Sequence, residues 1–86
     1  MEFTTKILIA DENPSQRMQV KDCFLRAGCR YIDEAINGED ALDKINRNHP
    51  DVVIIDIWMS KMDPIQVIKK AFQHDSGGYE PPAFIL

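Results

Sequence analysis

The most informative segment of the sequence is DVVIIDIWMSKMDP, residues Asp51–Pro64. Four apolar residues, Val52–Ile55, lead directly into Asp56, and a second aspartate, Asp63, follows seven positions later. An uninterrupted apolar run of this length is typical of a central parallel strand, which is covered on both faces. A carboxylate is costly to bury, so Asp56 at the end of such a strand calls for a functional explanation.

Length and charge restrict the class of protein. The 86 residues allow one small domain, and 44% of them are hydrophobic, as in an ordinary globular chain. The net charge of −4 argues against direct contact with nucleic acid or an anionic membrane, because both need a basic surface. No run reaches the roughly 18 apolar residues that suggest a membrane span. The first ten residues do not match a secretory signal, which favours the cytoplasm.

Short apolar runs and helical patterns alternate along the chain. The runs that predict strands are Lys6–Ala10, Tyr31–Ala35, Val52–Ile55 and Ala83–Leu86. Three helices are expected between them, with Asn13, Asn37 and Asp63 as their capping residues. Proline can follow such a cap at the first helical position, so Asp63-Pro64 is interpreted as a helix start. The turn-rich segment Asp75–Pro82 would connect the last helix to the last strand.

The first helix has a recognisable buried face and end. Val20, Cys23, Phe24 and Ala27 recur at helical spacing, and Gly28 is a suitable residue to end the helix. Two cysteines do not make a disulfide framework, so Cys23 and Cys29 are interpreted as reduced apolar residues of the core.

The order β-α-β-α-β-α-β predicts a doubly wound α/β fold, a parallel sheet with helices on both faces. The working site of such a sheet lies beyond the carboxyl ends of its strands. Asp11 and Glu12 follow the first strand, and Asp56–Met59 follows the third, so these residues are the candidates for the site.

Three carboxylates, those of Asp11, Glu12 and Asp56, are expected to converge at this edge. Like charges at short distance repel, so a cation would be needed to keep all three ionised. Oxygen ligands suit Mg²⁺, and a carboxylate beside Mg²⁺ can attack phosphorus to form an acyl phosphate. The alternative is that Asp11 and Glu12 only precede the helix cap, with Asp56 a solvated strand end.

These motifs resemble the receiver domain of bacterial two-component response regulators. The resemblance extends over Lys6–Leu86 and, within the family, is strongest to the master regulators of sporulation in endospore-forming bacteria. It implies a flavodoxin-like topology with strand order 2-1-3-4. The segments that carry it are ILIADEN (Ile7–Asn13), the helix positions Arg17, Val20, Phe24 and Gly28, AINGEDAL (Ala35–Leu42), PDVVIIDIWM (Pro50–Met59) and Met62-Asp63.

The resemblance also implies a role for each site residue. Asp56 would be the phosphorylation site, Asp11 and Glu12 would hold Mg²⁺ together with Asp56, and the main-chain carbonyl of Trp58 would complete the protein ligands. A histidine kinase or phosphotransfer protein would supply the phosphoryl group. Phosphorylation would then switch partner binding or transcription, so the chain is not expected to be an enzyme.

Three positions depart from the family pattern. Ser60 and Pro64 stand where receivers usually have proline and glycine, and proline at 64 is compatible with a first helical position. Trp58 either shields a phosphoaspartate from water or lies half-buried on the loop surface.

The resemblance implies that residues 1–86 are one receiver domain, but only its N-terminal two-thirds. The hydroxyl residue after the fourth strand, the fifth strand with its lysine and the last two helices would be missing. Phe84–Leu86 would then form an exposed edge strand, which can pair with another chain. The chain is expected to be a fragment of a longer regulator, or to complete itself as a homodimer through that edge. A second hypothesis is a pseudo-receiver that binds partners or dimerises without phosphotransfer.

Overall fold

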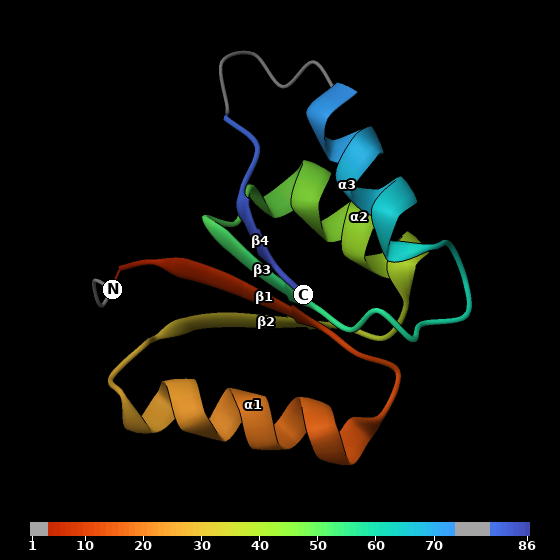
Figure 1. The fold of residues 1–86 in the computed structure, drawn as a ribbon. Coiled ribbons are helices and arrows are strands. Elements are labelled where there is room, and N and C mark those ends of the chain that lie inside the picture. Colours follow the sequence, from red (N-terminus) through yellow and green to blue (C-terminus); the bar gives the residue numbers. More distant parts are fainter. Residues whose placement is uncertain (1–3, 74–79) are drawn as a thin grey trace.

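The structure, a computed structural model, describes residues 4–73 and 80–86. Strands and helices alternate in the predicted order (Figure 1). The last strand ends one residue earlier than predicted, and most of the predicted connection Asp75–Pro82 lies outside the described residues. The elements are β1 (Lys6–Ala10), α1 (Pro14–Arg26), β2 (Tyr31–Ala35), α2 (Gly38–Asn48), β3 (Val52–Ile55), α3 (Pro64–Gln73) and β4 (Ala83–Ile85).

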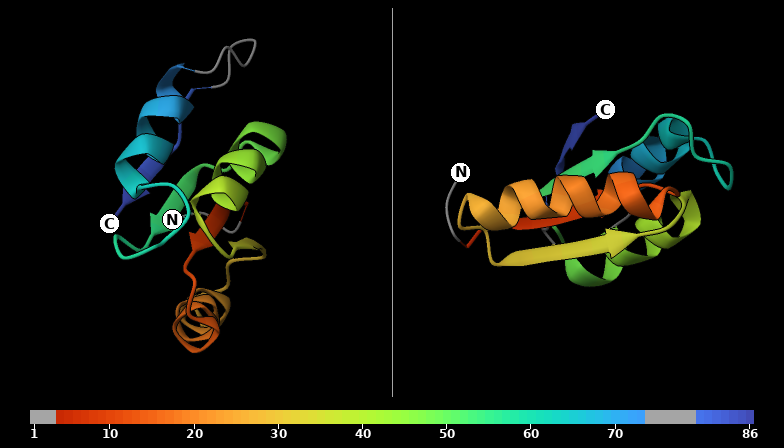
Figure 2. Two further views of the ribbon diagram at one scale, coloured as in Figure 1. Left: turned by 90° about the vertical axis from the view of Figure 1, so that its right-hand side faces the viewer. Right: turned by 90° about the horizontal axis from the view of Figure 1, so that it is seen from below.

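The four strands form one parallel sheet in the order β2-β1-β3-β4, which confirms the predicted topology. Strand β1 is central, and its last residue, Ala10, lies opposite both Ala35 and Ile55. Helix α1 covers one face of the sheet, while α2 and α3 cover the other (Figures 1 and 2). The carboxyl ends of β1, β2 and β3 therefore meet at a single edge.

The core is unequally divided between the two faces. The face under α2 and α3 buries a continuous cluster that includes Leu8, Val53, Ile55 and Ile45. The face under α1 buries only Ile7, Ile9 and Cys29, with partly buried residues packed around them. The sheet is thus anchored mainly from the α2–α3 side.

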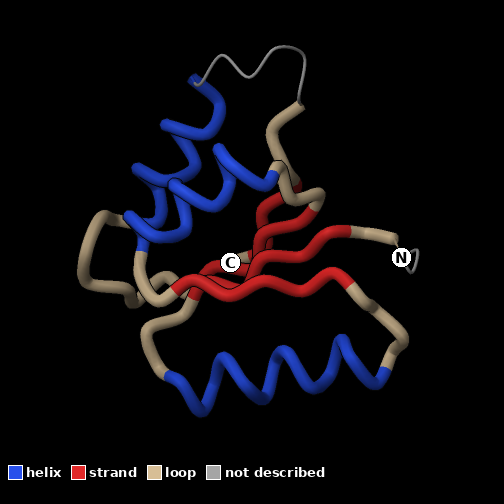
Figure 3. Tube along the Cα trace, turned by 180° about the vertical axis from the view of Figure 1, so that it is seen from behind, coloured by secondary structure: helices blue, strands red, loops and turns tan. Residues whose placement is uncertain are grey.

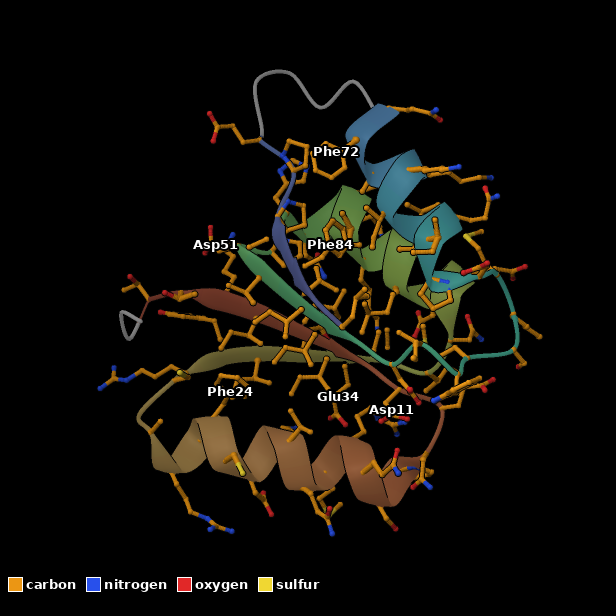
Figure 4. The ribbon with its side chains drawn as sticks, viewed as in Figure 1. Asp11, Phe24, Glu34, Asp51, Phe72 and Phe84 are labelled. Carbon is orange, nitrogen blue, oxygen red and sulfur yellow. The ribbon has the colours of Figure 1, made fainter. Side chains whose placement is uncertain are left out.

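Helix α1 lies less deeply than its sequence pattern predicts. It contains no fully buried residue, and Val20 and Phe24 alone of its four predicted face residues pack on the sheet. Figure 4 shows Phe24 pointing from α1 toward the strands. Cys23 and Ala27 are exposed, so the interpretation of Cys23 as a core residue is wrong, whereas Cys29 is buried. The contacts of α1 are mainly with β1 and β2.

Side-chain caps start all three helices at the carboxyl edge, as predicted. The Asn13 Oδ1 accepts hydrogen bonds from the main-chain N–H groups of Ser15 and Gln16, at 2.9 and 3.2 Å. The Asn37 Oδ1 accepts from Asp40 N at 2.8 Å, and the Asp63 Oδ1 accepts from Ile65 N at 2.9 Å. Each cap satisfies donors of the first turn that have no partner within the helix. The loops that carry the candidate site residues therefore have defined ends.

Strand β4 forms one outer edge of the sheet and pairs with β3 alone, while β2 forms the other edge (Figure 3). Phe84 was predicted to be exposed, but it is half-buried. The centroid of its ring lies 6.4 Å from that of Phe72. Ile85 and Leu86 are 49% and 64% exposed. The prediction of an exposed apolar edge is confirmed for these two residues.

Candidate functional site

Asp11 and Asp56 lie on neighbouring strands at the carboxyl edge. Asp11 directly follows β1 and its N–H donates to Ala35 O at 3.1 Å, while Asp56 directly follows β3 and its N–H donates to Ala10 O at 3.0 Å. The sheet hydrogen bonding thus extends to both residues. Figure 4 shows Asp11 at this end of the strands and Asp51 at the opposite end.

Each of the three predicted carboxylates is hydrogen bonded to a donor in a loop of this edge. Asp11 is 8% exposed and its Oδ1 accepts from Asn13 N at 2.9 Å. Asp56 is half-buried and its Oδ1 accepts from Trp58 N at 3.1 Å. Glu12 is exposed and both of its oxygens accept hydrogen bonds from Ser60.

The structure brings Asp11, Glu12 and Asp56 to one edge but not into one cluster. Among the residues that the structure describes, no group of three or more histidine, cysteine, aspartate or glutamate side chains is arranged to hold a metal ion. Carboxylate and carbonyl oxygens are nevertheless the ligand types that Mg²⁺ prefers. The residues therefore fit Mg²⁺ by chemistry, while Glu12 is turned toward the loop after β3.

The loop between β3 and α3 is held by a close contact with α2. Gly38 N donates to Lys61 O at 3.0 Å. A Cβ atom at position 38 would lie 2.5 Å from Met62 O and 2.6 Å from Lys61 O, closer than real Cβ atoms approach. Met62 itself has a positive φ of 67°, which is uncommon for a residue with a side chain. The glycine after Asn37 is thus required by packing, a role that the sequence analysis did not identify.

Trp58 stands in solvent beside the site. Its side chain is 82% exposed, so the expectation of a half-buried tryptophan is wrong. The neighbouring Ile57 is 50% exposed, and Ile36, at the carboxyl end of β2, is 57% exposed. Apolar side chains therefore flank the acidic edge and are available for contact with another molecule.

The sequence analysis also did not identify a network of charged side chains next to the site, formed by Arg17, Lys21 and Glu34. The Arg17 guanidinium donates from Nη1 to Asp11 O at 2.8 Å and from Nε to the Glu34 carboxylate at 2.9 Å. Lys21 Nζ lies 3.0 Å from the second Glu34 oxygen. These contacts, Lys21 first and then Arg17, lower the pKa of Glu34 below its ordinary value. Figure 4 shows Glu34 between β2 and α1.

The helical spacing of Arg17 and Lys21 is the one signal that could have indicated this network. Residues four apart lie on the same face of a helix, so both side chains can reach one acceptor. The acceptor could not be named, because Glu34 belongs to a strand whose register with β1 is set only by the folded sheet.

A hollow of about 560 Å³ lies at the other end of the strands. Its lining includes Lys6, Arg30, Tyr31 and Arg47, and none of the three predicted site carboxylates. The hollow is therefore distinct from the acidic edge.

The chain belongs to the response regulator receiver domain family, whose model matches residues 7–85. It is 38% identical over 71 residues to the chemotaxis protein CheY of Bacillus subtilis, a match that covers 83% of this chain and 59% of that protein. It is also 36% identical over 64 residues to a protein-glutamate methylesterase/protein-glutamine glutaminase of Archaeoglobus fulgidus, covering 74% of this chain and 18% of that one.

Solved receiver structures share the fold. The chemotaxis response regulator CheY4 of Vibrio cholerae superimposes with a TM-score of 0.80 at 26% identity, covering 94% of this chain and 67% of that one. The CheX–CheY–BeF3–Mg+2 complex of Borrelia burgdorferi contains a chain with a TM-score of 0.76 at 31% identity, covering 85% of this chain and 56% of that one. The strand order found here is that of these structures.

The family establishes a receiver domain of a two-component response regulator, consistent with phosphorylation on an aspartate. Receiver domains interact with histidine kinases or phosphotransfer proteins, and most are signalling modules, although some related proteins are enzymes. The chain spans about three-fifths of the Bacillus relative. No helix among the described residues is long and apolar enough to cross a bilayer.

Proposed function

We propose that this chain accepts a phosphoryl group on Asp56 from a histidine kinase or a phosphotransfer protein, with Mg²⁺ bound at the same edge. The observation that supports the proposal best is the position of Asp56. It directly follows the apolar strand β3 and is half-buried. Its N–H donates to Ala10 O, so the β1–β3 hydrogen bonding extends to Asp56, beside the end of the strand that Asp11 follows.

The proposed chemistry is the transfer of one phosphoryl group from the donor protein to Asp56. A carboxylate oxygen of Asp56 attacks phosphorus, the bond from phosphorus to the donor's leaving atom breaks, and an acyl phosphate forms. Asp11, Glu12 and Asp56, with the Trp58 carbonyl, would hold the Mg²⁺, which offsets the negative charge of the phosphoryl oxygens. The Borrelia complex, which contains Mg+2, supports this assignment.

Phosphorylation would act as a switch of partner binding, and not as a step in turnover of a metabolite. A relative that is 39% identical over 69 residues is a transcriptional regulatory protein of Bacillus subtilis, YhcZ, which supports a transcriptional output. On the sequence resemblance alone, the process controlled would be sporulation. The chain would act in the cytoplasm and supply the N-terminal part of a receiver domain. It spans 59% of one chemotaxis relative and 58% of another.

The test is phosphorylation of the purified chain by acetyl phosphate and Mg²⁺, followed by intact-mass measurement. The wild type is expected to gain the mass of one phosphoryl group, and Asp56→Asn to gain nothing. Asp63→Asn is the matched control, because Asp63 lies in the same loop but caps α3, and asparagine caps equally well. An equal gain by Asp56→Asn would exclude Asp56 as the acceptor.

A second function is favoured by one observation, the outer edge of β4. This strand pairs only with β3, and the exposed Ile85 and Leu86 lie at its end. Such an edge can add a strand from a second copy, which makes the chain a dimerisation module. Sedimentation would then show concentration-dependent dimers that Ile85→Lys abolishes, whereas Ile57→Lys, at an equally exposed site away from the edge, has no effect. A strict monomer at high concentration would exclude this function.

A further inference from the structure

Glu12 and Ser60 form a two-point contact between the loops after β1 and β3. The Ser60 main-chain N–H donates to Glu12 Oε1 at 2.9 Å, and the Ser60 hydroxyl donates to Oε2. The two residues are 48 positions apart in sequence. Both oxygens of the Glu12 carboxylate are thus engaged by one residue.

This contact distinguishes Glu12 from the other two carboxylates of the edge. Asp11 and Asp56 each use a single oxygen, Oδ1, to accept from the main-chain N–H two residues further on. As far as residues 4–73 and 80–86 are concerned, those bonds leave the second oxygen of each aspartate for another ligand. Glu12 is instead held against the loop after β3, and within the described ranges no group of three or more histidine, cysteine, aspartate or glutamate side chains is arranged to hold a metal ion.

The residue type at position 60 makes the contact possible. Serine supplies two donors, a main-chain N–H and a hydroxyl, and they match the two oxygens of a carboxylate. Alanine would keep only the N–H, and proline would have neither donor. Hydrogen bonds to a charged carboxylate are stronger than those between neutral groups, so this pair can compete with a cation for Glu12.

We propose that Ser60 is a positioning residue that latches Glu12 in the metal-free protein and thereby weakens Mg²⁺ binding. The proposal rests on the metal site of the proposed function. The hydrogen bonds from Ser60 must break or lengthen before the Glu12 carboxylate can contribute to Mg²⁺ binding. Removal of the hydroxyl from residue 60 therefore lowers the cost of metal binding and raises the affinity by about fivefold, the equivalent of one modest hydrogen bond.

The experiment has a metal arm and a metal-free arm, both on the full chain. Calorimetric titration with Mg²⁺ is expected to give about fivefold tighter binding for Ser60→Ala than for the wild type. Ser15→Ala is the control, because it removes a hydroxyl from an exposed side chain that is none of the proposed metal ligands, and it should bind as the wild type does. In the absence of metal, Glu12→Gln should shift the NMR signal of the Ser60 amide proton, and Glu39→Gln should leave it in place.

The outcomes separate the latch from the proposed function. Equal or weaker Mg²⁺ binding by Ser60→Ala, beside a wild type that binds, would overturn the latch and leave the metal site standing. A Ser60 amide signal unmoved by Glu12→Gln would overturn the latch as well. If neither the wild type nor Ser60→Ala binds Mg²⁺, both the metal site and the role of Ser60 in it are refuted.

Discussion

Replacement of Gly38 by alanine tests how the loop after β3 is held in place. The added methyl group would lie 2.5 and 2.6 Å from the carbonyl oxygens of Met62 and Lys61, whereas ordinary contact begins at 3.4 Å. These atoms belong to the main chain, so relief requires the loop to move by about 1 Å and to loosen its hydrogen bond with Gly38 N. Ser60 belongs to the same loop and would move with it.

The size of the effect follows from two opposing contributions. Overpacking of this kind costs about 1–3 kcal/mol. Alanine is better than glycine in a helix by at most about 1 kcal/mol, and Gly38 is only the first residue of α2. The net expectation is a loss of about 1–2 kcal/mol in the free energy of unfolding, which lowers the Tm of a domain of this size by about 4–8 °C per kcal/mol.

Urea unfolding followed by far-ultraviolet circular dichroism measures this loss. Trp58 fluorescence is a poor probe of unfolding, because the indole is already 82% exposed in the folded chain. Ser15→Ala is the matched control, since it places alanine in the first turn of α1 where the side chain is exposed, and it should change little. A Gly38→Ala protein as stable as the wild type, or more stable, would refute the argument that residues 61 and 62 leave no space for a Cβ atom.

Three further predictions concern the charge network, a cap and the core. Because Lys21 and Arg17 lower the pKa of Glu34, its ionised form stabilises the fold above the ordinary pKa of 4.5, and this contribution is lost as the pH falls through the lowered value. Glu34→Gln should therefore be less stable than the wild type at pH 7, by about 1 kcal/mol or less because the Glu34 side chain is partly exposed. This difference in stability should vanish toward pH 3. A difference in urea midpoints that does not change with pH would contradict the assignment. Asn37→Ala should cost about 1 kcal/mol through loss of the cap on Asp40 N, while Asn46→Ala, within the same helix, should cost less, and equal losses would show that the cap is unimportant. Ile55→Ala should cost about 2–5 kcal/mol because the side chain is 1% exposed, and the half-exposed Ile57→Ala should cost far less in the same unfolding assay; the reverse order would refute the placement of Ile55 in the core.

Local patterns in the sequence were sufficient for the order of the elements. The apolar run Val52–Ile55 predicts a central strand, and Asn13, Asn37 and Asp63 predict helix starts, because strand burial and helix capping involve residues close together in the chain. The same patterns place Asp56 at the carboxyl edge of the sheet. The structure confirms each of these predictions.

The depth of burial was less predictable than the position of the elements. Cys23 was expected in the core, and half-burial was one of the two alternatives for Trp58, but both side chains are exposed. Helical spacing shows which side chains share a face, but how much of that face is covered depends on the neighbouring elements. Helix α1 covers only part of its side of the sheet, and no pattern within the helix reports this.

The order of strands and helices places the three carboxylates at one edge, because a parallel sheet aligns the ends of its strands. The contacts of those carboxylates depend on how the loops fold against one another. Glu12 meets Ser60 across 48 residues, and Gly38 meets the loop that carries Ser60 because α2 packs beside it. Such contacts arise from the register of β1 with β3 and from loop conformation, and hydrophobic periodicity carries no information about either. The location of the site can therefore be predicted from the sequence, whereas the hydrogen bonds of its carboxylates depend on the folded structure.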